Sequence, residues 1–303
     1  MKIAFVNKYQ GKVNRGAETF VSELSKRLSK NHEVDVLNKI NFLKKYDIVI
    51  PTNGRLQVFV ARVYSWLTGA KMAVSGQSGV GLDDRLNLYA FPDAFVSISS
   101  YALEKSKKRN PFVKCVYIPN GVDLDKFSFK VRNLQGKSTV LSVGAFTEQK
   151  RHELVIKAVA KIKNTKLIIA GGGGDIKNKI YELGIKNLGK ERFEMFEVKH
   201  EEMPSIYQKA DVFTLASTPT ESFGIVLVEA MASGIPVVAT DDPIRREIVG
   251  DAGLFVDPTD TDAYAKGIEK VLNTNWDGKP RKQAEKFSWD KIALQYEELF
   301  KNL

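Results

Sequence analysis

The sequence has one cysteine, Cys115, and only three histidines in 303 residues. A single cysteine excludes an internal disulfide framework and a zinc site made of clustered cysteines. His32, His152 and His200 lie far apart in the sequence, whereas a histidine-rich metal site needs several histidines around one ion. We therefore expect neither a metal site of these kinds nor a fold stabilised by disulfides.

Long hydrophobic runs are also missing. No stretch approaches the roughly 18 uninterrupted apolar residues that a membrane-spanning helix requires. The apolar run of residues 1–6 suits a buried strand and is too short for a signal peptide. The expected location is therefore the cytoplasm. The apolar share of 43% suffices for two globular domains, each with its own core.

The net charge of +10 is concentrated in the first part of the chain. Residues 1–130 carry 21 Lys and Arg against 11 Asp and Glu, whereas residues 131–303 carry 25 of each. Such a basic segment can bind an anionic acceptor or dock on anionic lipid headgroups, at the inner face of a membrane. The alternative is a solubilising charge spread over all faces. Nucleic acid is not an expected partner, because no stacking aromatic residues punctuate the basic runs.

Short apolar runs alternate with longer amphipathic segments along the chain, which is typical of parallel α/β folds. The expected strands are residues 3–6, 34–37, 46–50, 71–75, 94–98, 116–118, 139–143, 166–170, 192–198, 212–216, 236–239, 244–248 and 254–256. The expected helices are residues 18–30, 58–67, 153–162, 176–183, 203–209, 224–232 and 289–300.

The alternation restarts after a polar segment, residues 127–137, which we interpret as a linker. Two such blocks predict two doubly wound, Rossmann-like domains that face each other across a cleft. We place the first domain at residues 1–130 and the second at residues 131–287. The last helix, within residues 288–303, is a candidate to pack back on the first domain. Ligands of open parallel sheets bind beyond the carboxyl ends of the strands, so we look for chemistry in the loops that follow them.

The densest motif follows the expected strand 212–216, where residues 220–238 read TESFGIVLVEAMASGIPVV. Glu221 lies in the loop, Gly224 opens a helix, and Glu229 lies in the second turn of that helix. The free amides and the dipole of a helix start favour a phosphate, and glycine permits a close backbone approach. One carboxylate can accept hydrogen bonds from sugar hydroxyls and the other can bind a ribose diol. A diphosphate with a sugar at each end needs such an arrangement.

This segment resembles the donor-binding segment of the family 4 retaining glycosyltransferases, which have the two-domain GT-B fold. Their signature is two glutamates separated by seven residues and followed by Ala-Met-Ala-x-Gly-x-Pro-Val-Val, and Glu221 and Glu229 match it. The resemblance implies a retaining, metal-independent hexosyltransferase whose substrate is a UDP- or GDP-linked sugar, without a further cofactor. The implied acceptor is a glycan, a lipid-linked molecule or a small molecule, as in polysaccharide or glycolipid biosynthesis. The implied donor-binding residues of this segment are Glu221, Ser222, Phe223, Gly224, Ile225, Val226 and Glu229.

A second match lies at the expected first helix. Residues 14–18 read NRGAE and resemble the family's Gly-Gly-Ala-Glu loop, whose backbone approaches the donor diphosphate. Arg15 stands in place of the first glycine, which leaves Gly16 to provide the approach. Residues 199–207 resemble the family's segment near the nucleobase, and we interpret His200 there as a helix-entry or packing residue.

A third match is the loop of residues 143–150, where relatives use an Arg and a Lys to neutralise the leaving nucleoside diphosphate. Lys150 matches the Lys, so the resemblance makes Lys150 and Glu221 the catalytic pair. Ala145 stands at the Arg position, and Arg151 is a candidate replacement. The four glycines at residues 171–174 are interpreted as structural, because no Gly-Lys-Ser/Thr follows them as in a P-loop.

The expected acceptor side departs from the family. Many relatives have a histidine after the strand that corresponds to residues 71–75, whereas this chain reads GQSGVG at residues 76–81. Gln77 or Ser78 would have to supply any polar contact there. Asp83-Asp84 and Asp241-Asp242 are adjacent pairs that we interpret as turn or cap residues.

The resemblance implies departure of the nucleoside diphosphate from the face that the acceptor attacks, with a phosphate oxygen helping to deprotonate the acceptor hydroxyl. Two alternatives stay open. The missing Arg and the missing histidine would suit a non-catalytic protein that binds nucleotide sugars. A sugar-nucleotide epimerase can have a similar two-domain fold, although it should lack the glutamate motif.

Overall fold

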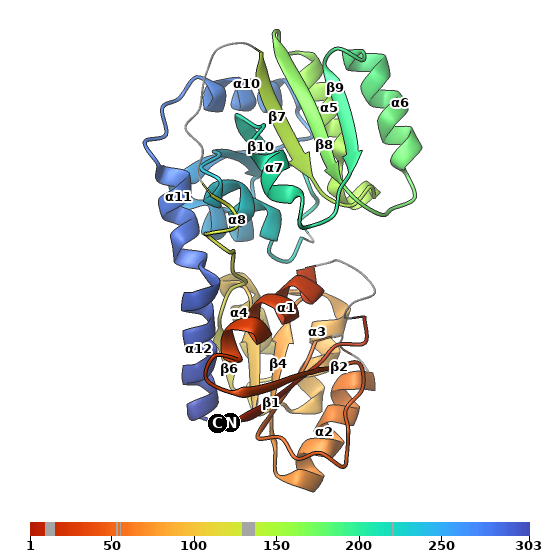
Figure 1. Cartoon of the computed structure of the whole chain (residues 1–303). Helices are drawn as coiled ribbons and strands as arrows, with labels where there is room; N and C mark the ends of the chain where they lie inside the picture. The colour runs from red at the N-terminus through yellow and green to blue at the C-terminus, as the bar shows by residue number, and fades with distance from the viewer. Residues whose placement is uncertain (10–15, 53, 55, 129–136, 220) are drawn as a thin grey trace. The chain divides into compact units, whose positions relative to one another are not determined.

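The computed structural model describes residues 1–9, 16–52, 54, 56–128, 137–219 and 221–303. It forms two units, each built on one parallel sheet with helices packed against it (Figure 1). Unit 1 comprises Met1–Gly121 and Phe287–Leu303, and unit 2 comprises Val122–Lys286. The Arg15 position and most of the expected linker lie outside the described residues.

Unit 1 has a six-stranded sheet in the order β2-β1-β3-β4-β5-β6, and each neighbouring pair is parallel. Its strands are β1 (Lys2–Val6), β2 (Glu33–Leu37), β3 (Ile48–Pro51), β4 (Lys71–Gly76), β5 (Ala94–Ser97) and β6 (Cys115–Tyr117). Its helices are α1 (Gly16–Leu28), α2 (Leu56–Thr68), α3 (Leu82–Asn87), the 3₁₀ turn η1 (Leu88–Ala90), α4 (Ser100–Arg109) and α12 (Trp289–Lys301).

Unit 2 has a second six-stranded parallel sheet, in the order β12-β11-β10-β7-β8-β9. Its strands are β7 (Ser138–Val143), β8 (Thr165–Gly171), β9 (Phe193–Glu197), β10 (Val212–Leu215), β11 (Val237–Thr240) and β12 (Gly253–Val256). Its α-helices are α5 (His152–Ala160), α6 (Lys177–Leu188), α7 (Met203–Tyr207), α8 (Ile225–Ala232), α9 (Pro243–Val249), α10 (Thr261–Leu272) and α11 (Lys279–Ala284). Its 3₁₀ turns are η2 (Glu148–Lys150) and η3 (Gly250–Ala252), and η4 (Glu285–Phe287) leads back into unit 1.

The C-terminal helix α12 belongs to unit 1, where it lies beside α1 (Figure 1). Trp289 is 1% exposed, and its ring centroid lies 6.1 Å from that of Phe20 on α1. A Cβ atom at Gly121 would lie 2.6 Å from the Trp289 ring, so only glycine lets the chain pass so close to this indole. Burial of large aromatic side chains from both ends of the chain therefore holds α12 in the core of unit 1.

The central strands consist almost entirely of buried apolar residues. β3, β5, β10 and β11 are buried at every position. This is the pattern of a parallel sheet covered by helices on both faces, and it explains why continuous apolar runs predicted these strands.

One expected strand is wrong. Residues 244–248 belong to helix α9, because Asp242 caps its start by accepting hydrogen bonds from the amides of Ile244 and Arg245 at 3.0 Å. Pro243 occupies the first turn, where its fixed φ suits a helix. The sequence analysis also missed α3, α4, α10 and α11. Among the described residues, no helix is both long and apolar enough to cross a lipid bilayer.

Candidate active site

In unit 2, β7 and β10 are neighbours, so the loops that leave their carboxyl ends start side by side. The amide of Thr218, in the loop after β10, donates to the carbonyl oxygen of Gln149, in the loop after β7, at 3.0 Å. This hydrogen bond joins the two segments that carry the predicted catalytic residues.

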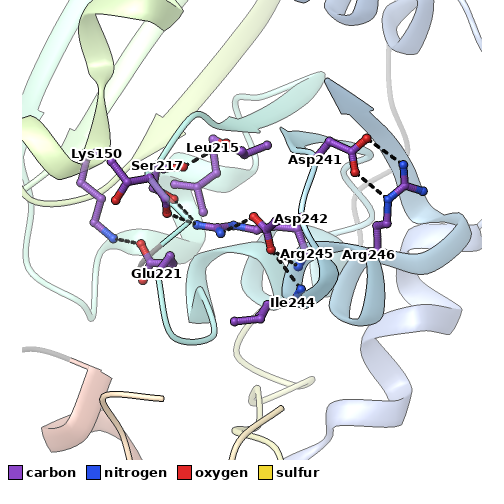
Figure 2. A network of polar contacts seen from close by, with 11 residues as sticks. Lys150, Leu215, Ser217, Glu221, Asp241, Asp242, Ile244, Arg245 and Arg246 are labelled. Carbon is purple, nitrogen blue, oxygen red and sulfur yellow. Dashed lines mark hydrogen bonds and ion pairs between the residues drawn. The ribbon is translucent and has the colours of Figure 1, made fainter. Parts of the chain in front are cut away.

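Lys150 and Glu221 form an ion pair between these two loops (Figure 2). Their side chains are 21% and 19% exposed, so both charged groups remain within reach of a ligand. The methylene groups of Lys150 lie along Gly144, where an added Cβ would be 3.1 Å from Lys150 Cδ. The structure thus brings together the two residues that the sequence predicted to act on the donor.

Gly171 and Gly174 let the chain at the end of β8 approach the loop after β7 closely. A Cβ at Gly171 would lie 1.9 Å from the carbonyl oxygen of Gly144, and one at Gly174 would lie 2.1 Å from that of Phe146. The amide of Phe146 donates to the carbonyl oxygen of Gly173 at 2.8 Å. Gly171 and Gly174 therefore help to position the loop that bears Lys150.

Gly224 precedes helix α8 with φ 80° and ψ 65°, a left-handed conformation that glycine adopts without strain. Its carbonyl oxygen accepts the amide of Leu227 at 2.8 Å, which starts the helical hydrogen bonding. The amides of Ile225 and Val226, at the start of the helix, have no acceptor within the helix by virtue of their position. With the helix dipole they can bind the oxygens of an anion.

Glu229 lies on α8 and is 3% exposed. His200 Nε2 lies 3.0 Å from Glu229 Oε1, and the Tyr207 hydroxyl donates to Glu229 Oε2 at 2.8 Å. Lys126 Nζ lies 3.1 Å from His200 Nδ1. Because an ammonium group can only donate, Nδ1 accepts, and Nε2 of a neutral His200 carries the proton that binds Glu229.

The Tyr207 hydroxyl is protonated and so can donate its hydrogen bond to Glu229. Complete burial, followed by the negative charge of Glu229, raises the pKa of its hydroxyl well above the ordinary value. Both oxygens of Glu229 thus accept one hydrogen bond each from the protein. His200, predicted as a packing residue, orients the second predicted glutamate.

Arg245 is a residue of this site that the sequence analysis missed. It is 0% exposed, forms an ion pair with Asp242, and donates to Ser217 Oγ at 2.7 Å and to the carbonyl oxygen of Thr218 at 3.0 Å (Figure 2). Its guanidinium group therefore holds the loop that leads to Glu221. The only available signal was the cap motif Asp242-Pro243, which predicts a helix start and hence the placement of Arg245 in its first turn.

Arg151 follows Lys150 with φ 53°, the left-handed region, between η2 and α5. The pKa of Asp257 is lowered by hydrogen bonds from Thr259 and, to a smaller degree, by the charge of Arg151. This electrostatic contribution places Arg151 near the segment after β12. Within the described residues, the Arg151 side chain forms no ion pair with Glu221.

In unit 1, the predicted acceptor residues Gln77 and Ser78 line a cavity of about 390 Å³. Its lining residues are Tyr9, Ala17, Glu18, Thr52, Gly54, Gln77, Ser78, Asp83, Asp84 and Asn87. Gln77 and Asn120 exchange hydrogen bonds between their amide groups at 3.0 and 3.2 Å. The hydroxyl of Ser78 accepts the amide of Asp84 at 3.3 Å. Gly16, whose backbone was expected to approach the donor, begins α1.

The cavity in unit 1 contains two buried carboxyl groups that the sequence analysis did not select. Glu18 and Asp84 are 5% and 4% exposed, and neither Glu18 Oε2 nor Asp84 Oδ2 has a hydrogen-bond partner in the part of the chain that the structure describes. Burial raises the pKa of Asp84 to about 7. Such oxygens favour a ligand that brings hydrogen-bond donors, because a buried acceptor without a partner costs free energy.

The two sheets define the chain as a GT-B protein. Anabaena HepE, solved in complex with UDP and glucose, aligns over 100% of both chains with a TM-score of 0.84 at 17% identity. Sucrose-phosphate synthase from Thermosynechococcus elongatus aligns over 100% of this chain and 98% of that chain, with a TM-score of 0.80 at 19% identity. The GT-B fold predicted from the sequence is therefore confirmed.

Residues 123–288 match the family described as Glycosyl transferases group 1, and the chain belongs to this family. An uncharacterized glycosyltransferase from Methanocaldococcus jannaschii is 35% identical over 178 residues, 54% of this chain and 44% of that protein. The phosphatidyl-myo-inositol mannosyltransferase of Mycolicibacterium smegmatis is 32% identical over 196 residues, 59% of this chain and 50% of that protein. The D-inositol 3-phosphate glycosyltransferase of Corynebacterium urealyticum is 32% identical over 200 residues, 61% of this chain and 44% of that protein. The chain spans about half the length of these curated relatives.

Proposed function

We propose that this protein is a retaining, metal-independent glycosyltransferase that transfers a hexose from a UDP- or GDP-linked sugar to an acceptor hydroxyl. The ion pair of Lys150 and Glu221 carries the proposal, because it sets a cation and a carboxylate at the ends of two adjacent strands. The ammonium group of Lys150 would bind the diphosphate, and the carboxylate of Glu221 would accept hydrogen bonds from hydroxyls of the transferred sugar. The cytoplasmic location expected from the sequence stays a prediction.

In the proposed reaction, the bond between the anomeric carbon and the diphosphate oxygen breaks, and the bond to the acceptor oxygen forms on the same face of the sugar. The acceptor proton passes to an oxygen of the departing phosphate. Lys150 and the amides at the start of α8 stabilise the negative charge that develops on the diphosphate. Glu221 orients the sugar, and Glu229 binds the ribose hydroxyls, so both glutamates act by positioning.

We assign the acceptor to the cavity of unit 1. Glu18 Oε2 and Asp84 Oδ2 are suited to accept hydrogen bonds from a hydroxyl-rich molecule, while Gln77 and Ser78 complete the polar wall. Two relatives are named for acceptors that contain inositol, which supports a polyol as the acceptor class.

The test is to incubate the protein with UDP- and GDP-hexoses and an acceptor. Turnover is measured as release of the nucleoside diphosphate, and NMR of the product's anomeric proton gives its configuration. We expect release to depend on Glu221 and the anomeric configuration of the donor to be kept. Binding of the donor without turnover on any acceptor would favour the non-catalytic alternative. An inverted product would contradict the retaining mechanism.

A further inference from the structure

Helix α2 carries apolar side chains on two opposite faces. One face is buried in unit 1 through Val58, Ala61 and Tyr64. The other face is exposed and consists of Leu56, Phe59, Val60, Val63, Trp66 and Leu67. These positions recur at intervals of three and four residues or as direct neighbours, so they form one stripe along the helix. Trp66 and Leu67 are 69% and 73% exposed.

The loop before β3 extends this stripe. Phe42 is 48% exposed and Leu43 is 97% exposed. The Phe42 ring packs edge-on against Tyr64 of α2, with centroids 5.6 Å apart, so the loop lies beside the helix. We call Phe42, Leu43 and the six exposed residues of the stripe the α2 face. Soluble proteins rarely expose an apolar patch of this extent unless it contacts another molecule.

A groove of about 560 Å³ adjoins the α2 face. Phe42, Leu56 and Val60 belong to both, and Lys8 and Lys39 also line the groove. Tyr9 and Gly54 line both the groove and the polar cavity that contains Glu18 and Asp84. An apolar surface thus leads through a groove with lysines at its wall to the cavity assigned to the acceptor.

The charges around the α2 face indicate which kind of partner binds there. The segment that forms α2 contains no Asp or Glu, and its one charged residue, Arg62, pairs with Asp93 at 2.9 Å and lies over the Trp66 ring at 5.2 Å. Lys39, at the wall of the groove, forms no ion pair within the described part of the chain. A second copy of this face would bring like charges together, whereas anionic headgroups would neutralise them.

We propose that the α2 face seats this protein on an anionic lipid bilayer, so that a lipid-linked acceptor enters the groove from the membrane. The apolar stripe lies at the level of the acyl chains and Trp66 near the headgroups, as in helices that lie in the plane of a bilayer surface. Lysine side chains reach the anionic headgroups by extending along the surface. The acceptor part rests on the proposed function, whereas the docking does not.

The test is co-sedimentation of the whole chain with phosphatidylglycerol–phosphatidylcholine vesicles and with phosphatidylcholine vesicles. We expect binding to the anionic vesicles that is weaker at high salt and about tenfold or more weaker in the Leu43→Asp/Leu67→Asp double variant. Phe112→Asp is the matched control, because Phe112 is 88% exposed in unit 1 but lies outside the α2 face. It should bind like the wild type.

Two readouts separate the outcomes. The thermal shift caused by a nucleotide sugar should be the same in the double variant and the wild type, so a failure of donor binding is distinguishable from a failure of docking. Equal vesicle binding by the double variant and the wild type would overturn the proposal. So would a lipid-free dimer, seen by analytical ultracentrifugation, that the double variant dissociates, because the α2 face would then be covered by a second copy.

Discussion

Lys150 and Glu221 pair across the ends of β7 and β10, with roughly four-fifths of each side chain covered by protein. A pair that is neither fully exposed nor fully buried contributes on the order of 1 kcal/mol to stability, because loss of hydration offsets much of the attraction between the charges. Its position beyond the carboxyl ends of two central strands makes it available for a ligand that brings both a negative charge and hydroxyl groups.

Replacing either member should therefore affect turnover far more than folding. For Glu221→Ala and for Lys150→Ala we expect kcat/KM to fall by about 10²–10³, because one group that stabilises or orients the reacting sugar is lost. The urea midpoint should change little. The matched control is Glu194→Gln, which removes a partly exposed partner of Lys166 on β8 and β9 and should leave turnover intact. Equal losses in Glu221→Ala and Glu194→Gln would contradict the assignment.

The two adjacent arginines of α9 should differ in their effect on stability. Arg245→Met should lower the free energy of unfolding by about 3 kcal/mol or more, because it leaves the carboxylate of Asp242 buried without its partner. Arg246→Met removes a pair with Asp241 whose side chains are 58% and 42% exposed, and should leave the free energy of unfolding almost unchanged because solvent screens this pair. Urea unfolding of both variants measures the difference, and similar costs would refute the role assigned to Arg245.

Asp84 should make stability depend on pH. Burial raises the pKa of its carboxyl from 3.8 to about 7, so the folded protein holds this proton more tightly than the unfolded chain between these values. The free energy of unfolding should therefore fall as the pH rises across this window, by roughly 4 kcal/mol at most. Asp84→Asn should lose this contribution. The free energy of unfolding of both proteins is measured from about pH 4 to about pH 8. If it changes with pH by the same amount in the wild type and Asp84→Asn, Asp84 does not titrate in this way.

Gly171, the last residue of β8, and Gly172 after it offer a test of how the loop of Lys150 is held. Gly171→Ala should destabilise unit 2 by about 2 kcal/mol or more and reduce turnover, because its Cβ would meet the carbonyl oxygen of Gly144 at 1.9 Å. Gly172→Ala is the control, since an added Cβ there meets nothing within 4 Å. Thermal unfolding and turnover of both variants check the prediction. Equal behaviour of the two variants would contradict it.

The sequence predicted the sheets well because their central strands are buried on both faces and so appear as uninterrupted apolar runs. It failed at residues 244–248, which read IRREI, because the strand was expected there although the decisive signal was the helix cap made by Asp242. Five residues with two isoleucines are too few for hydrophobic periodicity to separate a strand from a helix.

Glu221 and Glu229 could be selected as candidate donor residues because they stand at a fixed spacing in one segment. Arg245, Glu18 and Asp84 could not, because their importance depends on burial and on partners from distant parts of the chain. The surrounding structure decides whether an acidic residue caps a turn or lies in a cavity without a partner. The pair Asp83-Asp84 had the same appearance in the sequence as the cap residue Asp242.

The most direct test of the central claim measures the thermal unfolding of the wild type and Glu221→Ala with UDP-, GDP- and ADP-linked sugars. The account predicts that at least one nucleotide sugar raises the unfolding temperature of the wild type, and that the same sugar raises it less for Glu221→Ala. If no nucleotide sugar stabilises the wild type, or if Glu221→Ala responds like the wild type, Glu221 does not bind a nucleotide-sugar donor.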